Sequence, residues 1–149
     1  MIVSSSSILY KNNIGEYGQK GQEWLLELPK IIKALTRHYQ LSNVRPNGYL
    51  SWGYLCHADM LGAGPVILKI LCDERHAQRE VATLRAFEPS GGTPTVFWYD
   101  REYTTIIMQN VRPGTTMQSL FATREDEAIE QTCVLIEKMQ SVNASQEGN

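Results

Sequence analysis

A lysine lies within a segment that otherwise has the pattern of a buried β-strand. In PVILKIL, residues 65–71, the alternation of a strand places Lys69 on the same face as Ile67 and Leu71. An unpaired charge in such a place costs on the order of several kcal/mol, so the ammonium group needs a partner. Glu80 is the candidate, because it falls on the edge of the apolar stripe of the following helical segment. The pair predicts an ion pair between strand and helix; alternatively, Lys69 extends to the sheet edge and Glu80 faces water.

The elements that would position this pair follow from periodicity and turn residues. Three strand-like stretches come first, then a helix for which Asp73 is a plausible N-cap, then a hairpin that turns at residues 100–102, and a final amphipathic helix. The stretches cover residues 41–45, 50–58 and 65–71 for the strands, 73–87 for the first of these helices, 93–111 for the hairpin and 124–142 for the last helix. The order predicts an α+β fold.

The N-terminal part divides into two segments. Residues 1–20 are rich in Ser, Asn and Gly and are expected to form a loose arm. Residues 21–40 carry apolar side chains at helical spacing but include Pro29, which favours two short helices with Pro29 in the first turn of the second. The expected organisation is therefore an arm (1–20), N-terminal helices (21–40), a sheet lobe (41–112), and a linker, amphipathic helix and polar tail (113–149).

Composition excludes several classes of protein. The chain has 149 residues, of which 42% are hydrophobic and 20% charged, as in an ordinary globular protein. Its net charge of −2 gives no sign of the excess of basic residues that typically binds nucleic acid. No apolar run approaches the roughly 20 residues that span a bilayer, and the N-terminus lacks the pattern of a signal peptide. The three cysteines are far apart and form no C-x-x-C, which favours free thiols in a reducing compartment. We therefore expect a cytoplasmic protein without membrane or nucleic-acid partners.

Other candidate sites are weaker. His57 and His76, with Asp59 and Asp73, could be metal ligands, but no metal-binding spacing supports them, so no metal site is predicted. The acidic segment 124–130 is explained as the solvated first turn of a helix.

The order of elements, with its lysine and glutamate, resembles the N-terminal lobe of the protein-kinase-like fold. That fold implies a five-stranded antiparallel sheet with one packed helix. More narrowly, the chain resembles the aminoglycoside and hydroxyurea phosphotransferase family, in the branch of streptomycin kinases. The resemblance covers roughly residues 22–142 and is carried by five segments: WLLELPKIIKALTRHYQL (24–41), GYLSWGYL (48–55), GPVILKI (64–70), EVATLRAF (80–87) and MQNVRPGTTM (108–117).

The resemblance implies an ATP site. Lys69 would hold the α- and β-phosphates, and Glu80 would hold Lys69. The remaining nucleotide contacts would come from the loop after the first strand, an apolar ceiling over the base, and main-chain groups of a hinge: Gly48, Ser51, Ile67, Gln109, Asn110 and Val111. The loop departs from the family pattern because it is poor in glycine, which permits close approach of backbone to phosphate.

The resemblance further implies a second lobe with a His-Gly-Asp…Asn catalytic loop and a Mg²⁺-binding Asp, and these 149 residues contain no such motif. We expect these residues to be a lobe that a truncated gene encodes or that remains from a cut chain, and we expect this lobe to be inactive alone. The intact enzyme would pass the ATP γ-phosphate to a hydroxyl of an aminoglycoside-, hydroxyurea- or metabolite-like acceptor. The alternative is a non-enzymatic relic that binds nucleotide or a partner protein. The wide apolar face of segment 124–142 predicts self-association, docking on the sheet or poor order, with self-association preferred.

Overall fold

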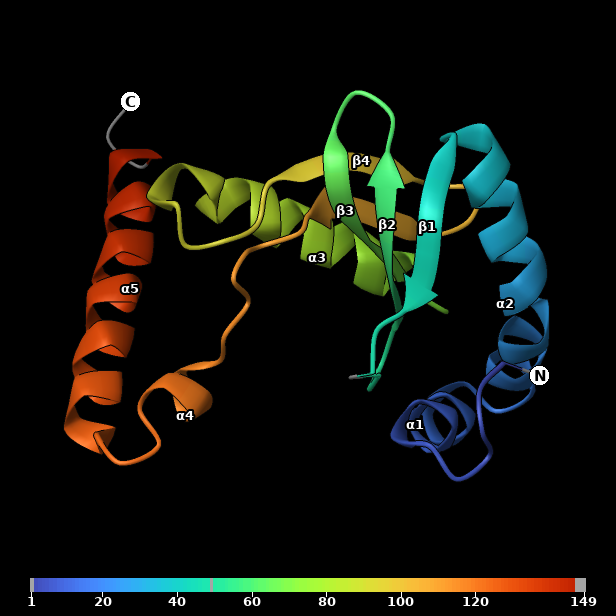
Figure 1. The fold of residues 1–149 in the computed structure, drawn as a ribbon, viewed down its shortest axis with the longest axis horizontal. Helices are drawn as coiled ribbons and strands as arrows, with labels where there is room; N and C mark the ends of the chain where they lie inside the picture. Colours follow the sequence, from blue (N-terminus) through green and yellow to red (C-terminus); the bar gives the residue numbers. More distant parts are fainter. Residues whose placement is uncertain (1, 49, 147–149) are drawn as a thin grey trace.

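A five-stranded antiparallel sheet forms the centre of the molecule (Figure 1). The computed structural model describes residues 2–48 and 50–146, with side chains as far as residue 142. The spatial order of the strands is β1-β2-β3-β5-β4, so the last strand in sequence is inserted beside β3. The predicted α+β class and antiparallel sheet are confirmed. The strands are β1 (Leu41–Pro46), β2 (Tyr54–Met60), β3 (Gly64–Ile70), β4 (Val96–Asp100) and β5 (Thr105–Gln109).

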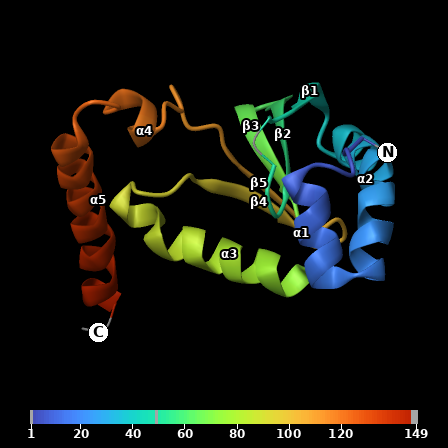
Figure 2. The same ribbon diagram turned by 90° about the horizontal axis from the view of Figure 1, so that it is seen from below.

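Helices cover both faces of the sheet (Figure 2). Helices α1 (Ile8–Tyr17) and α2 (Gln19–His38) pack on one face, and α3 (Glu74–Phe87) packs on the other. A 3-10 turn, η1 (Glu88–Ser90), follows α3, and α4 (Met117–Leu120) and α5 (Glu125–Gln146) end the described chain. Within the described residues, none of these helices combines the length and apolarity needed to cross a bilayer.

Strand β3 separates two apolar cores because its side chains alternate. Val66, Leu68 and Ile70 are buried in the larger core beneath α1 and α2. Ile67 and Leu71 belong to the smaller core beneath α3. Both faces of this central strand are therefore covered, as the sequence predicted.

Helix α2 corrects one expectation, because Pro29 lies inside a continuous helix rather than between two short ones. A proline in a helix interior costs roughly 3 kcal/mol. Leu25 and Leu28 before it and Leu35 after it are all fully buried in the same core. Each such burial stabilises by about 1.5–3 kcal/mol, so packing outweighs the proline.

The N-terminal segment corrects a second expectation, because residues 1–20 contain the packed helix α1 rather than a loose arm. Ser7 caps it by accepting a hydrogen bond from the Tyr10 backbone N–H at 3.2 Å. Helix α1 then meets α2 closely: a Cβ added to Gly21 would lie 2.2 Å from the Asn13 carbonyl oxygen. Glycine at residue 21 is what allows this contact.

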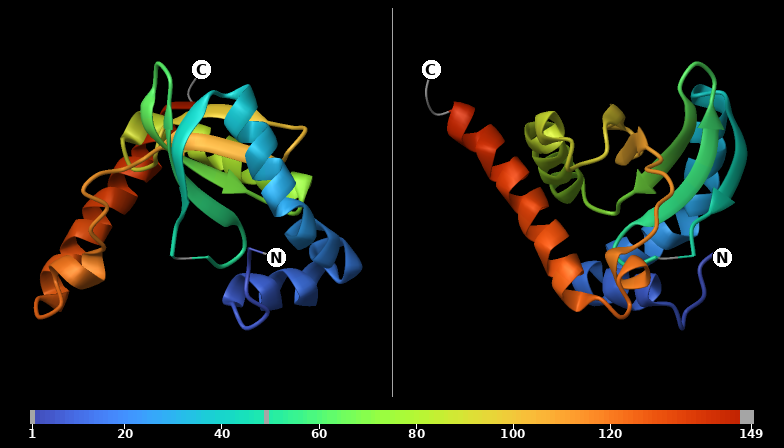
Figure 3. Two further views of the ribbon diagram at one scale, coloured as in Figure 1. Left: turned by 45° about the vertical axis from the view of Figure 1, so that its right-hand side comes forward. Right: turned by 60° about the vertical axis from the view of Figure 1, so that its left-hand side comes forward.

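Helix α5 lies at one side of the molecule, away from the N-terminal helices (Figure 1 and the left-hand view of Figure 3). It packs on the C-terminal end of α3 and on η1, and much of its apolar surface, including Ile129 and Ile136, is exposed. Of the three outcomes predicted for this segment, docking on the sheet is not what the structure shows. The helix extends past the predicted residue 142 to Gln146, and the end of the predicted polar tail, residues 147–149, lies outside the described residues.

The two edge strands share a structural irregularity. The register of β1 against β2 shifts between Ser42 and Arg45, and the register of β4 against β5 shifts between Val96 and Trp98. Asn43, within the first of these shifts, has a positive φ of 52°. Regular pairing is thus confined to the inner strands, where β2, β3 and β5 pair without a shift.

Candidate functional site

The predicted ion pair between β3 and α3 is present. Lys69 Nζ donates to Glu80 Oε1 at 2.6 Å, and the two side chains are 23% and 31% exposed. Helix α3 brings the carboxylate to the sheet because Ala77 and Val81 are buried against it. The first turn of α3 is fixed by Asp73, whose Oδ1 accepts from the His76 backbone N–H at 3.0 Å. The confirmed contact makes Lys69 a fixed, partly buried cation.

Gly53 is a residue whose part in the site was not predicted. It is buried beside the stem of Lys69, and a Cβ built on it would lie 3.2 Å from Lys69 Cγ and 3.1 Å from Leu71 Cδ2. Such distances are tighter than ordinary contacts, so a larger residue would push the lysine stem aside. Its glycine identity was visible in the sequence, but the contact depends on how the loop folds back.

A cavity of about 1030 Å³ lies on the sheet face that carries Ile67 and reaches the chain after β5. It brings together four of the predicted site residues, which are Ile67, Gln109, Asn110 and Val111. The ion pair does not line it. Lys69 lies two residues further along the same face of β3 as Ile67, which corresponds to about 7 Å. The cavity and the fixed cation are therefore neighbours along one strand.

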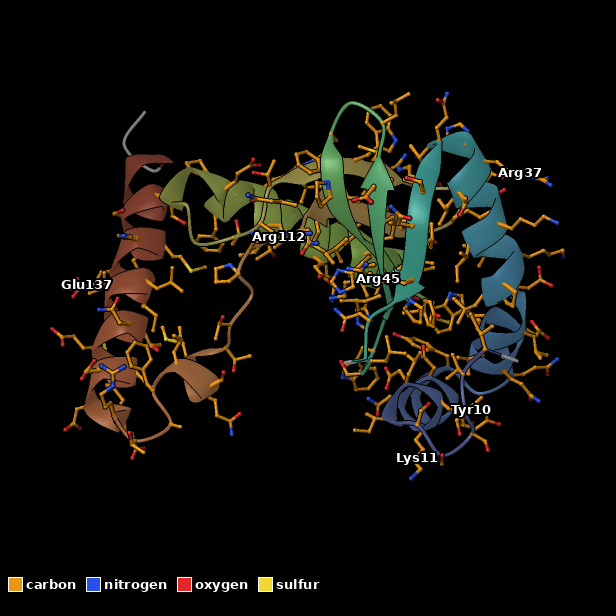
Figure 4. All side chains as sticks on the ribbon, viewed as in Figure 1. Tyr10, Lys11, Arg37, Arg45, Arg112 and Glu137 are labelled. Atoms are coloured by element: carbon orange, nitrogen blue, oxygen red, sulfur yellow. The ribbon has the colours of Figure 1, made fainter. Side chains whose placement is uncertain are left out.

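The cavity wall is positively charged. Arg45, at the end of β1, and Arg112, just after β5, both line it, together with His57 (Figure 4 labels the two arginines). Within the described residues neither arginine forms an ion pair with a carboxylate, and no Asp or Glu is among the lining residues. These three residues were not predicted as site residues. The arrangement is suited to an anionic ligand.

The hinge segment offers main-chain groups, although not all of those predicted. The Gln109 backbone N–H donates to the Thr95 carbonyl at 2.8 Å and is therefore occupied by the protein itself. Val111 follows the end of β5, and within the described chain its backbone makes no hydrogen bond. The backbone N–H of Gln109 is thus not available to a ligand, whereas the main-chain groups of Val111 are.

Gly48 and Ser51 lie in the loop between β1 and β2, outside the large cavity. Gly48 is exposed, with open space where a Cβ would be. The Ser51 carbonyl accepts from Asn12 Nδ2 at 3.0 Å, and the Trp52 carbonyl accepts from Asn13 Nδ2 at 3.2 Å. Helix α1 thus holds the loop through hydrogen bonds, and the loop lacks the glycine-rich backbone that would approach a phosphate closely.

A smaller cavity of about 300 Å³ lies where α1, this loop and the start of α3 meet. Tyr17 hydroxyl and His76 Nδ1 are hydrogen-bonded at 2.7 Å across this junction, and Lys20 pairs with Asp73 at 3.3 Å. Burial, and next the charge of Asp73, raises the pKa of Tyr17. The backbone N–H of His76 is the main cause that lowers the pKa of Asp73. These contacts join α1 and α2 to the N-terminal end of α3.

The histidines weighed as metal ligands are not brought together. His57 lines the large cavity, whereas His76 contacts Tyr17 at the smaller one. Across the part of the chain that the structure describes, no three His, Cys, Asp or Glu side chains converge as metal ligands would.

The site thus combines a fixed lysine, an adjoining cationic cavity and a loop tied to the N-terminal helix. Function is inferred from this chemistry, since the chain matches no protein-family model, no curated protein and no solved structure.

Proposed function

We propose that the chain is an ATP-binding lobe of a small-molecule phosphotransferase. The observation that carries the proposal is the 2.6 Å contact between Lys69 on the central strand and Glu80 on the packed helix. In protein kinases a strand lysine contacts the nucleotide phosphates and must be held by a helix glutamate. The position of the lysine on the third of five strands supports the same role here.

The shape and charge of the cavity fit an adenine nucleotide. Ligand pockets are typically about 300–1,000 Å³, and the volume of about 1030 Å³ lies just above that range. Ile67 and Met108 provide apolar surface for a base, and the chain around Val111 provides main-chain groups. Arg45, Arg112 and Lys69 provide positive charge for phosphates. The base would therefore lie over Ile67, and the phosphates would extend toward Lys69.

The residues of this lobe would bind and orient the nucleotide, not perform the chemistry. When bound, ATP supplies the γ-phosphoryl group, and transfer of that group depends mainly on positioning and on neutralising its charge. The family that the sequence resembles places its catalytic base and Mg²⁺ ligands in a second lobe. An aminoglycoside-, hydroxyurea- or metabolite-like hydroxyl is the acceptor class that this resemblance implies.

Calorimetric titration of ATP and Mg²⁺ into the protein tests the proposal. Lys69→Ala should weaken binding by about 1–3 kcal/mol, the range for a charge-assisted contact. Lys30→Ala is the matched control, because Lys30 is exposed on α2, which packs on the face of the sheet opposite to the one that carries the cavity. Equal affinity of wild type and Lys69→Ala would refute the phosphate role.

A second candidate is a non-enzymatic protein that binds nucleotide or a partner chain. The exposed apolar side chains of α5 favour it, because soluble monomers rarely leave such a patch in water. Under both proposals, the pure 149-residue chain should release no ADP in the presence of streptomycin or hydroxyurea as acceptor. Acceptor-dependent ADP release would rule out the non-enzymatic candidate and would show that a catalytic base lies within this sequence.

A further inference from the structure

Helix α1 is joined to the β1–β2 loop by two neighbouring asparagines. Asn12 donates to the Ser51 carbonyl, and Asn13 donates both to the Trp52 carbonyl and to the Leu9 carbonyl of its own helix. Because backbone carbonyls are the acceptors, the contact fixes the path of the loop itself and not merely a side chain. The N-terminal helix therefore holds the loop that precedes β2.

The end of the loop that Asn13 holds packs against Lys69. Trp52 is followed directly by Gly53, which is packed against Lys69 Cγ and the Ile70 carbonyl, each 3.2 Å from the position of its missing Cβ. A shift of the Trp52 carbonyl would carry Gly53 with it, because the two share a peptide unit. The contacts thus form a continuous path from Asn13 through Trp52 and Gly53 to the stem of Lys69.

The burial of Asn13 indicates that its amide donor is needed. Its side chain is fully buried, and its Oδ1 has no hydrogen-bond partner among the residues that the structure describes. A buried acceptor without a partner is destabilising, and an apolar side chain of similar size would avoid that cost. The close contact with Gly21 then fixes the backbone from which this donor projects.

We propose that Asn13 is a positioning residue for the phosphate end of the site: it holds the loop carbonyl of Trp52 so that Gly53 confines the Lys69 stem. The proposal rests on the proposed nucleotide function for its effect on ATP, whereas its effect on the loop is independent of any ligand. Loss of the amide should free the loop and leave the hinge side of the cavity, which recognises the base, unchanged.

The first experiment measures the loop without nucleotide. Chymotrypsin cleavage after the half-exposed Trp52 reports the open population of the loop when opening is faster than cleavage. Asn13→Ala should speed this cleavage about fivefold or more, the factor that corresponds to one lost hydrogen bond. Leu35→Ala is the control, because it also truncates a fully buried side chain, but Leu35 lies near the C-terminal end of α2. An unchanged rate in Asn13→Ala, or an equal increase in the control, overturns the proposal.

The second experiment compares ATP with adenosine as titrants. Asn13→Ala should weaken ATP binding about 3–20-fold and leave adenosine binding unchanged, because only ATP has phosphates for Lys69. Equal loss for both ligands would mean that Asn13 is merely structural. If Asn13→Ala does not fold, the less buried Asn12→Ala gives the same comparison through the Ser51 carbonyl. If wild type binds neither ligand, the proposed function fails, and the cleavage experiment still decides the role of Asn13 in the loop.

Discussion

The Lys69–Glu80 contact should contribute measurable coupling energy to folding. The perturbation is a double-mutant cycle of Lys69→Met, Glu80→Gln and the double variant, which removes the charges and keeps the length of the side chains. Exposed ion pairs contribute about 0.2–1 kcal/mol, whereas breaking a buried pair costs about 3–5 kcal/mol. With side chains 23% and 31% exposed, this pair lies between those limits, and we expect a coupling free energy of about 1–2 kcal/mol.

Urea unfolding followed by circular dichroism gives the four free energies. The chain contains its own control in Lys30–Glu27, a pair of 2.8 Å on the surface of α2 with side chains 77% and 54% exposed. Its cycle should give about 0.5 kcal/mol or less, and added salt should remove most of it. If the coupling of Lys69 to Glu80 is no larger than that of the control, the two charges are not held together in solution, and the reasoning about the site fails.

Three further predictions concern packing, pH and association. In thermal melts, Gly21→Ala should lower the free energy of unfolding by about 1–3 kcal/mol, because the added Cβ would collide with the backbone of Asn13. Gly15→Ala on α1, where nothing lies within 4 Å of an added Cβ, should be neutral or stabilising. Burial raises the pKa of the Cys56 and Cys72 thiols from 9.0 to about 11, so above pH 9 the folded state keeps protons that the unfolded chain releases. Urea unfolding at a series of pH values should therefore show that the free energy of unfolding falls between pH 9 and 11. The same pH profile in Cys56→Ala/Cys72→Ala would contradict this. Wild type should sediment as an oligomer and Ile129→Glu/Ile136→Glu as a monomer, and a monomeric wild type would show that α5 is not the contact surface.

Local pattern predicted most of the sheet lobe, although β2 runs from Tyr54 to Met60 rather than over the predicted residues 50–58. Alternation located β3, the turn residues separated the strands, and the stripe of α3 with its Asp73 cap placed Glu80 correctly. Where the sequence misled, long-range packing decided. Pro29 indicated a helix break, but leucines on both sides of it are buried in one core. The polar start of the chain indicated a loose arm, although Ser7 is the cap of a packed helix.

The candidate site was predictable only in part, for a related reason. Lys69 and Glu80 belong to adjacent elements, so spacing sufficed to pair them. Arg45 and Arg112 line the same cavity because β5 is inserted beside β3. Arg45 thereby lies in one row of paired residues with Met108, near the end of β5 from which the chain continues to Arg112. No local pattern encodes that convergence. The contact of Gly53 with Lys69 likewise depends on a loop path that α1 determines.

The register shifts in the two edge strands have a consequence for how the protein avoids aggregation. An edge strand offers unpaired N–H and C=O groups, and a flat apolar edge can template pairing with another chain. Strand β4 is such an edge, and it exposes Phe97 and Trp98. A bulge bends and twists its strand, which spoils the straight row of groups that an incoming strand would need. Because β1 and β4 each carry one, both open edges of the sheet are poor templates for an incoming strand.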